Sequence, residues 1–381
     1  MAHHSSASSA GRPKLTDEWP LALTVGMLGL TLVGKSWIAG ALNQPALLII
    51  WLALICGVIL SAAFAMVRHA DVLAHRLGEP AGTLLLTLAI TGLEVSMVGF
   101  VMSTGEEKPT LARDTMFAVV MLVLNGFMGL ALLVGGLRHR KQSFNLQSAN
   151  AFLVLILPLT VLGLVLPNYT RATVGPTLSS FQMIFLSVMS VAIYGIFLIV
   201  QNQRHRGFFM APEEAAATAA AVAAEPAHQD SSPTAYHATL LALYGLPLVL
   251  LAKQMATPLD ALVSRLGAPT ALGGFVMALL VLTPESIAAV RAAQANRLQR
   301  SINVLLGSVL ASIGLTIPLV ITVSIVTGRS LELGLGATDV VMLLLTLATS
   351  VLTFSVARTH LLLGCVHLML FGAYLMLMFD R

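Results

Sequence analysis

The feature that most constrains this chain is a series of apolar stretches, each about 20 residues long, separated by short polar connections. A helix of about 20 residues spans the hydrocarbon core of a bilayer. Only 10% of the residues are charged, whereas soluble proteins carry about 25%. We therefore predict an all-α polytopic membrane protein, embedded in the lipid bilayer, with about eleven transmembrane helices at residues 20–40, 46–67, 82–103, 115–137, 149–167, 176–202, 237–256, 268–290, 302–327, 339–357 and 360–379.

The sequence lacks the signals of several other classes of protein. It contains no Gly-rich phosphate loop, no HExxH zinc motif and no nucleophile elbow, so we do not expect an enzyme. The formal net charge of +4 is spread over the loops and does not indicate nucleic-acid binding. Cys56 and Cys365 lie in apolar stretches, where cysteine packs as a small hydrophobic residue. No motif indicates a permanently bound cofactor.

The distribution of basic residues predicts an orientation. Loops on the side of the N-terminus hold 13 Lys and Arg residues and those on the opposite side hold 6, while Lys35 and Lys253 lie inside predicted spans. Loops rich in Lys and Arg face the cytoplasm. We therefore expect a cytoplasmic N-terminus and an external C-terminus.

The two halves of the chain share a motif. Arg-Leu-Gly-x-Pro occurs at 76–80 and at 265–269, and the apolar span that follows contains one glutamate, Glu94 or Glu285. Each half has five predicted spans, and an odd number gives repeats of opposite orientation, as in many secondary transporters. We predict an N-terminal tail with the first helix at residues 1–45 and a first five-helix repeat at 46–202. A cytoplasmic linker that is rich in Ala, Pro and Ser and mildly acidic follows at 203–236, and a second five-helix repeat at 237–381.

Glu94 and Glu285 are the main candidate site residues, as ligands of a metal cation and of protons. A charged side chain at the bilayer centre costs about 2.5 kcal/mol or more, so intramembrane carboxylates are functional candidates by default. The alternative is a protonated glutamate that only bonds to a neighbouring helix. Two glutamates at matching repeat positions favour the functional interpretation.

The residues next to the glutamates supply further oxygen atoms. Thr91 lies on the same helical face as Glu94, together with Thr83 and Thr87. Pro284 has no N–H to donate to the carbonyl of Leu280, and a freed carbonyl beside a carboxylate is suited to a hard cation. The alternatives are a hydroxyl that bonds to its own helix and a kink without a ligand role.

Two other spans contain candidate lining residues. The span after Glu285 carries Gly307, which allows close helix approach, and hydroxyl groups on one face at Ser308, Ser312 and Thr316. The fourth span carries Asn125, which lines the site or simply bridges helices. We interpret His367, in the last span, as a helix-packing residue.

At these residues the chain resembles the calcium/proton exchangers of the cation/calcium-exchanger superfamily, over nearly its whole length. The segment RHADVLAHRLGEP, residues 68–80, and the membrane glutamate after it are similar to those of bacterial members. The wider family has a Gly-Asn-Ala-x-Glu core, and AITGLE and VLTPE stand in its place here, with Ser286 where the family has His. A Gly-Ser-x-Leu-Gln element is matched by Gly307, Ser308 and Leu310, with Ala311 in place of Gln.

The resemblance implies an antiporter in the inner (plasma) membrane of a bacterium. We expect Ca²⁺ and protons to compete for Glu94 and Glu285, with alternating access coupling outward movement of cytoplasmic Ca²⁺ to inward movement of protons. The missing Asn and Gln ligands keep a Na⁺(K⁺)/H⁺ antiporter open as the alternative. A rival from another class is a channel or a membrane sensor with a structural glutamate pair, but an inverted repeat favours alternating access.

Overall fold

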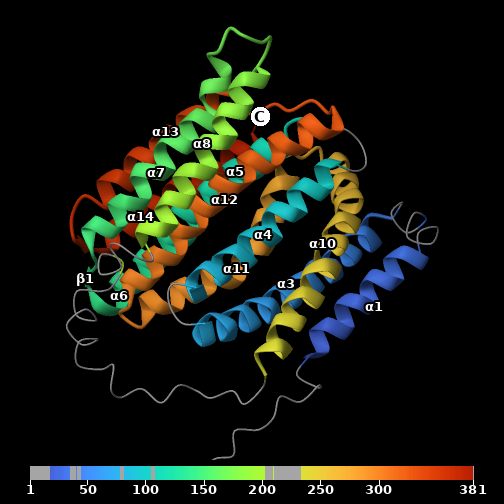
Figure 1. Ribbon diagram of the computed structural model, residues 1–381, viewed down its shortest axis with the longest axis horizontal. Helices are drawn as coiled ribbons and strands as arrows, with labels where there is room; N and C mark the ends of the chain where they lie inside the picture. The colour runs from blue at the N-terminus through green and yellow to red at the C-terminus, as the bar shows by residue number, and fades with distance from the viewer. Residues whose placement is uncertain are drawn as a thin grey trace, which may run out of the picture.

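The computed structural model describes residues 18–34, 40, 44–77, 81–103, 108–201, 209 and 233–380. Within them, long helices lie side by side (Figure 1). In chain order they are α1 (Trp19–Val33), α3 (Pro45–Leu77), α4 (Ala81–Ser103), α5 (Leu111–Val120), the π-helix η2 (Met121–Phe127), α6 (Met128–His139), α7 (Leu146–Leu164), the short 3-10 helix η3 (Leu166–Asn168), α8 (Ser180–Ile199), α10 (Thr234–Arg265), α11 (Ala271–Gln294), α12 (Leu298–Thr327), α13 (Ala337–Thr353) and α14 (Leu361–Phe379).

These helices confirm the predicted all-α membrane architecture. Eight are long and apolar enough to cross a membrane, and shorter apolar helices at Trp19–Val33, Leu88–Met102 and Ala337–Thr353 complete the predicted set of eleven. Helix α3 extends to Leu77 and α10 to Arg265, beyond the predicted ends at 67 and 256. Hydropathy detects only the apolar part of a helix, whereas the charged turns at these ends continue the same α-helix.

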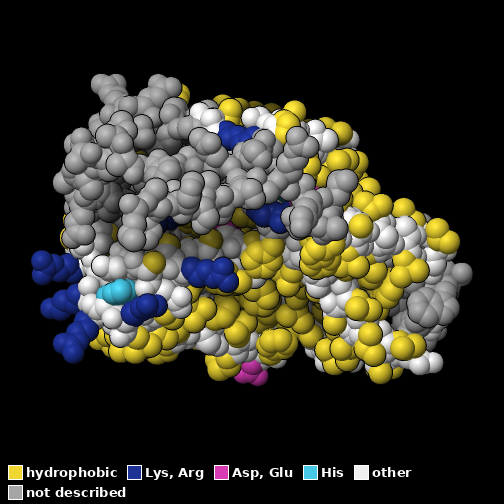
Figure 2. All heavy atoms as spheres, turned by 90° about the horizontal axis from the view of Figure 1, so that it is seen from below, with side chains coloured by type: hydrophobic (Ala, Val, Ile, Leu, Met, Phe, Trp, Pro, Cys, Tyr) yellow, Lys and Arg dark blue, Asp and Glu magenta, His cyan; other side chains and the backbone are white. Residues whose placement is uncertain are grey.

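The outer surface is largely apolar. Hydrophobic side chains cover most of the described surface in Figure 2, while Lys and Arg gather at the end where Figure 1 places α6 and β1. Phe181 on α8 is 80% exposed and Val154 on α7 is 68% exposed. Such a surface is suited to lipid, which solvates apolar side chains and leaves charged groups to the ends of the helices.

The interior contains two hydrophobic cores. One core is formed by α1, α3 and α10 together with one side of α4 and α11. The other contains the buried faces of α5 to α8 and α12 to α14. Helices α4 and α11, which carry Glu94 and Glu285, therefore lie where the two cores meet, with Leu93 in the first core and Val98 in the second.

The two halves of the chain are related by inversion. Counterpart helices have similar lengths, with 33 residues in α3 against 32 in α10 and 23 in α4 against 24 in α11. Helices α3 and α10 run antiparallel, because Cys56 Sγ lies 3.7 Å from Met255 Sδ and His69, later in α3, contacts His237 at the start of α10. The contacts between the two halves also correspond. Helix α4 of the first half packs on α12 of the second, and α11 of the second half packs on α5 and α6 of the first.

Small residues let α6 and α14 approach at backbone distance. A Cβ atom built on Gly364 would lie 2.5 Å from the Leu133 nitrogen, and one on Gly129 would lie 3.0 Å from the Leu368 nitrogen. Neither clash involves a flexible side-chain end, so a larger residue at either position would separate the helices. Close packing through glycine is typical of membrane helices, where dispersion replaces the hydrophobic effect as the attractive force.

A two-residue antiparallel pair connects two loops at one end of the bundle. Strand β1 (Gln142–Ser143) pairs with β2 (Arg358–Thr359), with Gln142 opposite Thr359. The Gln142 amide also donates to the Ala293 carbonyl, over 2.8 Å. No local sequence pattern predicts this pair. Most of the predicted 203–236 linker lies outside the described residues, so the division into tail, repeats and linker stays a prediction.

Candidate functional site

Helix α12 brings the two candidate glutamates together. Ser312 donates a hydrogen bond from its Oγ to Oε1 of Glu94 on α4, over 2.5 Å. Ser308, one helical turn earlier, donates its hydroxyl to Oε1 of Glu285 on α11. The carboxylates come from corresponding helices of the two halves and are held on one face of a third helix.

The two serines that bind the glutamates lie on neighbouring turns of α12. Cβ atoms of residues four apart in a helix are about 5–6 Å apart. The hydroxyls that donate to Glu285 and Glu94 therefore lie about one helical turn apart on one face of α12.

The site is largely screened from solvent, and within the described residues no basic side chain forms an ion pair with either glutamate. Glu94 is 3% exposed, Ser312 is fully buried and Glu285 is half-buried. The ion pairs within the described part of the chain involve other acidic residues, namely Glu18, Asp114 and Asp260. A buried carboxylate without a basic partner is stabilised by binding a proton or a cation.

Further hydroxyl groups surround the pair. Thr91 is 4% exposed and lies one turn before Glu94. The buried hydroxyls of Ser286, next to Glu285, and of Thr316, one turn after Ser312, have no hydrogen-bond partner among the described residues. Leaving a buried polar group unpaired costs about 1–3 kcal/mol. Ser286 and Thr316 are thus buried hydroxyls without an internal partner on the two helices α11 and α12, while the side chains of Thr83 and Thr87 lie outside the described residues.

Pro284 lies inside α11 without ending it, since the helix continues from Ala271 to Gln294. The Leu280 carbonyl consequently has no N–H partner four residues later. The hydroxyl of Thr283 donates to the neighbouring carbonyl of Leu279, over 2.5 Å. The proline thus leaves one carbonyl free of its helical hydrogen bond within one turn of Glu285, as the sequence predicts.

Two predicted lining residues have other neighbours. A Cβ atom on Gly307 would meet the Phe152 ring at 3.6 Å, so Gly307 faces α7. Asn125 lies in η2 and donates to Thr346 over 2.8 Å, while its Oδ1 lies 3.1 Å from Nδ1 of His367. The structure therefore places Asn125 in a helix bridge, one of the two interpretations left open, and no hydrogen bond between described residues joins it to either glutamate.

The same bridge accounts for His367. Its Nδ1–H donates to Asn125, and its Nε2 lies 3.0 Å from the Thr353 hydroxyl, which donates to it. A neutral imidazole satisfies both contacts. This network links η2, α13 and α14, which agrees with the interpretation of His367 as a packing residue. A π-helix within a long helix often marks a functional element, and here it turns Asn125 toward α13 and α14.

Comparison with known proteins identifies the family. A sequence model of the sodium/calcium exchanger protein family matches residues 47–202 and 236–379. The chain belongs to this family. The matched segments are those that contain helices α3 to α8 and α10 to α14. The protein is thus a cation exchanger of the membrane, consistent with the paired carboxylates in its interior.

Relatives of this exchanger include bacterial transporters. It is 43% identical to y4hA of Sinorhizobium fredii, named as an ionic transporter, over 87% of this chain and 89% of the relative. It is 39% identical to the sodium-potassium/proton antiporter ChaA of Escherichia coli, over 84% and 86% of the two chains. The crystal structure of the Ca²⁺/H⁺ antiporter YfkE has the same fold, with a TM-score of 0.71, 16% identity, and coverage of 95% of this exchanger and 99% of that chain.

Sequence reasoning missed two charged features of this exchanger. Lys253 lies inside α10, with its Nζ 4.9 Å from the centre of the Phe100 ring on α4, although α10 was identified only as an apolar span. Glu18, at the start of α1, is 8% exposed and bonds to residues of α3 and α10. A charged residue beside or within an apolar stretch was the available signal in both cases.

Proposed function

We propose that this exchanger is a secondary antiporter that moves Ca²⁺ against protons, and that Glu94 and Glu285 bind both. The observation that supports this best is the pair of intramembrane carboxylates on α4 and α11, bound to adjacent hydroxyls of α12 and without a basic partner. Alternating access would expose one site to each side in turn, with a cation or protons bound but not both.

The number of oxygen atoms around the pair is adequate for calcium. Two carboxylates offer four oxygens, and Ser308 and Ser312 offer two more. Ca²⁺ takes about 6–8 oxygen ligands, and two carboxylates neutralise its charge. In this proposal the Leu280 carbonyl, which Pro284 deprives of its helical hydrogen bond, would add a further oxygen. In this proposal the serine hydroxyls turn from donating to the carboxylates to binding the ion through their lone pairs.

A specific observation favours a second candidate, Na⁺(K⁺)/H⁺ exchange. The E. coli relative at 39% identity is named a sodium-potassium/proton antiporter. In addition, Asn125 is bound to His367, which leaves the site without a described amide ligand. A monovalent cation needs only one negative charge, so one glutamate would bind it while the other kept a proton.

Inverted membrane vesicles separate these candidates. A preformed pH gradient, acid inside, is followed with a fluorescent dye while Ca²⁺, Na⁺ or K⁺ is added. A calcium antiporter dissipates the gradient at the lowest concentration with Ca²⁺, and a monovalent antiporter does so with Na⁺ or K⁺. A gradient that none of the cations dissipates would exclude antiport and leave the channel or sensor alternatives.

We further propose a multi-pass location in the bacterial plasma membrane with a cytoplasmic N-terminus, based on the 13-to-6 bias of Lys and Arg in the loops. A Ser231→Cys variant without the native cysteines tests the orientation, since Ser231 lies in the predicted linker. We expect it to resist a membrane-impermeant maleimide in whole cells and to react after permeabilisation. Labelling of intact cells would invert the proposed orientation.

A further inference from the structure

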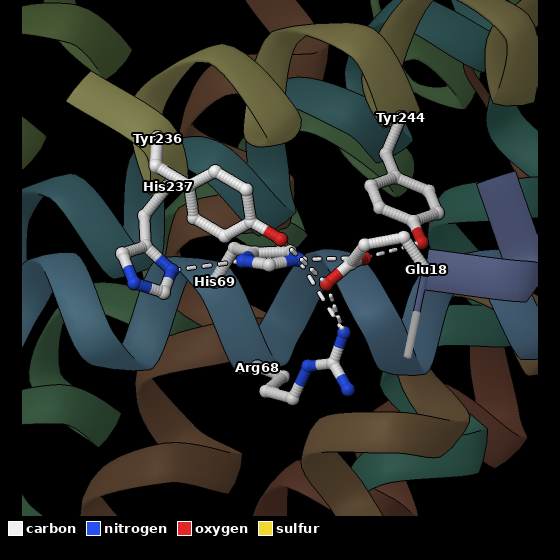
Figure 3. Close-up of polar contacts among 6 residues, drawn as sticks. All are labelled: Glu18, Arg68, His69, Tyr236, His237 and Tyr244. Carbon is white, nitrogen blue, oxygen red and sulfur yellow. Dashed lines mark hydrogen bonds and ion pairs between the residues drawn. The ribbon is translucent and has the colours of Figure 1, made fainter. Parts of the chain in front are cut away.

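A second buried cluster of ionisable side chains lies away from the exchange site, where α1 and α10 begin (Figure 3). The Glu18 carboxylate accepts hydrogen bonds from three residues. Arg68 donates over 2.9 Å, His69 Nε2 lies at 3.1 Å and the Tyr244 hydroxyl donates over 2.9 Å. Tyr236 adds a longer contact of 3.4 Å. One carboxylate therefore connects the start of α1 to both α3 and α10.

The cluster continues from one imidazole to another. Nδ1 of His69 lies 2.9 Å from Nδ1 of His237, and the two histidines are 2% and 3% exposed. A contact of this length between two ring nitrogens holds one hydrogen atom. In the neutral pair, His237 donates to His69, which donates its Nε2–H to Glu18. After a proton is added, His69 is an imidazolium that donates in both directions, and His237 accepts.

This geometry limits the number of protons that the pair holds. If both histidines were imidazolium ions, two N–H groups would point at each other across 2.9 Å. The second positive charge would also face the first at close range in a buried position. The pair therefore accepts one added proton while the contact persists, and the proton is shared through a chain that ends at Glu18.

The surrounding charges are nearly balanced. Burial would raise the pKa of Glu18, but hydrogen bonds from His69 and Tyr244 and the positive charges of His69 and Arg68 outweigh it, so the pKa is lowered. Glu18 is thus an anion at neutral pH, where it attracts the added proton, whereas Arg68, which is half exposed, opposes it. Among the described residues, the ionisable groups in contact with His69 include Glu18 at the start of α1, Arg68 from α3, and Tyr236, His237 and Tyr244 from α10.

We propose that Glu18, His69 and His237 form a second proton-binding site, which binds one proton as a unit and makes exchange depend on pH at the membrane face where it lies. The added proton converts a hydrogen bond between Glu18 and His69 into an ion pair, which is stronger. It thereby tightens the contact that holds α1, α3 and α10 together.

Helix packing connects the contact between Glu18 and His69 to the exchange site. Helices α3 and α10 share a core with Leu93, next to Glu94, and with Leu280 and Val281 of α11, one turn before Glu285. Alternating access requires two arrangements of these helices, and a ligand favours the arrangement that it binds better. We therefore expect protonation of the cluster to stabilise the arrangement in which Glu18 and His69 are in contact. Acidification of this membrane face should then slow exchange, because the helices leave that arrangement less often.

Proton counting on the purified protein tests the shared site directly. Proton uptake between about pH 8 and 5, the range in which histidine titrates, is compared for the wild type and a His69→Gln/His237→Gln variant without cations. We expect the double variant to take up one proton fewer. A difference of zero or of two protons would contradict the proposal. His360→Gln, which removes an exposed histidine outside the cluster, is the matched control for the substitution itself.

Transport measurements test the functional consequence. Exchange is measured in proteoliposomes with the pH varied only on the face that bears the cluster. We expect the double variant to lose the slowing at acid pH that the wild type shows. Tyr244→Phe is the matched control, because it removes a hydrogen bond to Glu18 but no group that titrates between about pH 5 and 8, and it should still show slowing at acid pH. If both variants exchange more slowly than the wild type by the same factor at every pH, the cluster has only a structural role.

A single substitution covers the case in which the double variant does not fold. Glu18→Gln keeps a hydrogen-bond acceptor for Arg68 and Tyr244 but removes the negative charge beside His69. We expect the midpoint of the pH dependence to move to lower pH by about one unit, which is about tenfold in proton affinity. An unchanged midpoint would exclude Glu18 from the site. None of these outcomes depends on which cation is exchanged at Glu94 and Glu285.

Discussion

Glu94→Gln and Glu285→Gln each abolish cation/proton exchange, while the protein still inserts and folds. Glutamine keeps the shape and the carbonyl oxygen that accepts the hydrogen bond from Ser312 or Ser308. It has neither a negative charge for the cation nor a site for the exchanged proton. A pair of unit charges 4 Å apart is worth about 4 kcal/mol at an effective dielectric constant of 20, which is about a thousandfold in affinity.

The measurement is exchange by each purified variant in proteoliposomes, with monodispersity on size exclusion as the test of folding. Glu332→Gln is the matched control, because Glu332 lies in the connection between α12 and α13, where its backbone N–H donates to the Pro109 carbonyl. The control should exchange as the wild type does. Substantial exchange by a folded Glu94→Gln or Glu285→Gln protein would remove that glutamate from the mechanism.

Much of the architecture could be predicted from local patterns. Apolar length identifies the spans because the bilayer imposes it, and the repeated Arg-Leu-Gly-x-Pro motif pairs Glu94 with Glu285. The four-residue spacing of Ser308 and Ser312 also predicts one helical face. The spacing of residues along a helix shows which of them share a face, but it does not show which other helices that face contacts. That α12 lies between the two glutamate helices required the structure.

The contacts that the sequence did not predict join distant residues. Asn125 and His367 are 242 positions apart, and Glu18 and Tyr244 are 226 apart. Nothing in the local sequence of either partner encodes the other. Asn125 has the residue type of a cation ligand, but the π-helix η2 and the close packing of α6 on α14 direct it to His367. Tertiary packing thus gives Asn125 hydrogen-bond partners on α13 and α14 that its residue type does not predict.

Apparent Ca²⁺ affinity rises with pH if Ca²⁺ and protons compete for Glu94 and Glu285. The motivating observation is that both carboxylates accept a serine hydrogen bond but neither forms an ion pair within the described residues. At low pH the site holds protons, which Ca²⁺ must displace. As the pH rises, releasing them costs less free energy, so the affinity increases over the range in which the site is protonated.

The slope of this dependence counts the displaced protons. Release of two protons gives about a hundredfold gain in affinity per pH unit, and release of one gives about tenfold, since each tenfold corresponds to about 1.4 kcal/mol. Because the carboxylates interact, the steps of the titration belong to the pair and not to either residue. Glu285→Gln serves as the internal comparison, since with one carboxylate left at most one proton is released and the slope cannot exceed tenfold per unit.

Calorimetry in detergent between about pH 6 and 9 measures both quantities. Titration with Ca²⁺ gives the affinity, and repetition in two buffers of different ionisation enthalpy gives the number of protons released. The two estimates must agree if protons leave as Ca²⁺ binds. The His69→Gln/His237→Gln variant should keep the same slope, because its proton site is separate from the exchange site. An affinity that does not change with pH, together with heats that do not change with buffer, would exclude competition even if the protein binds calcium.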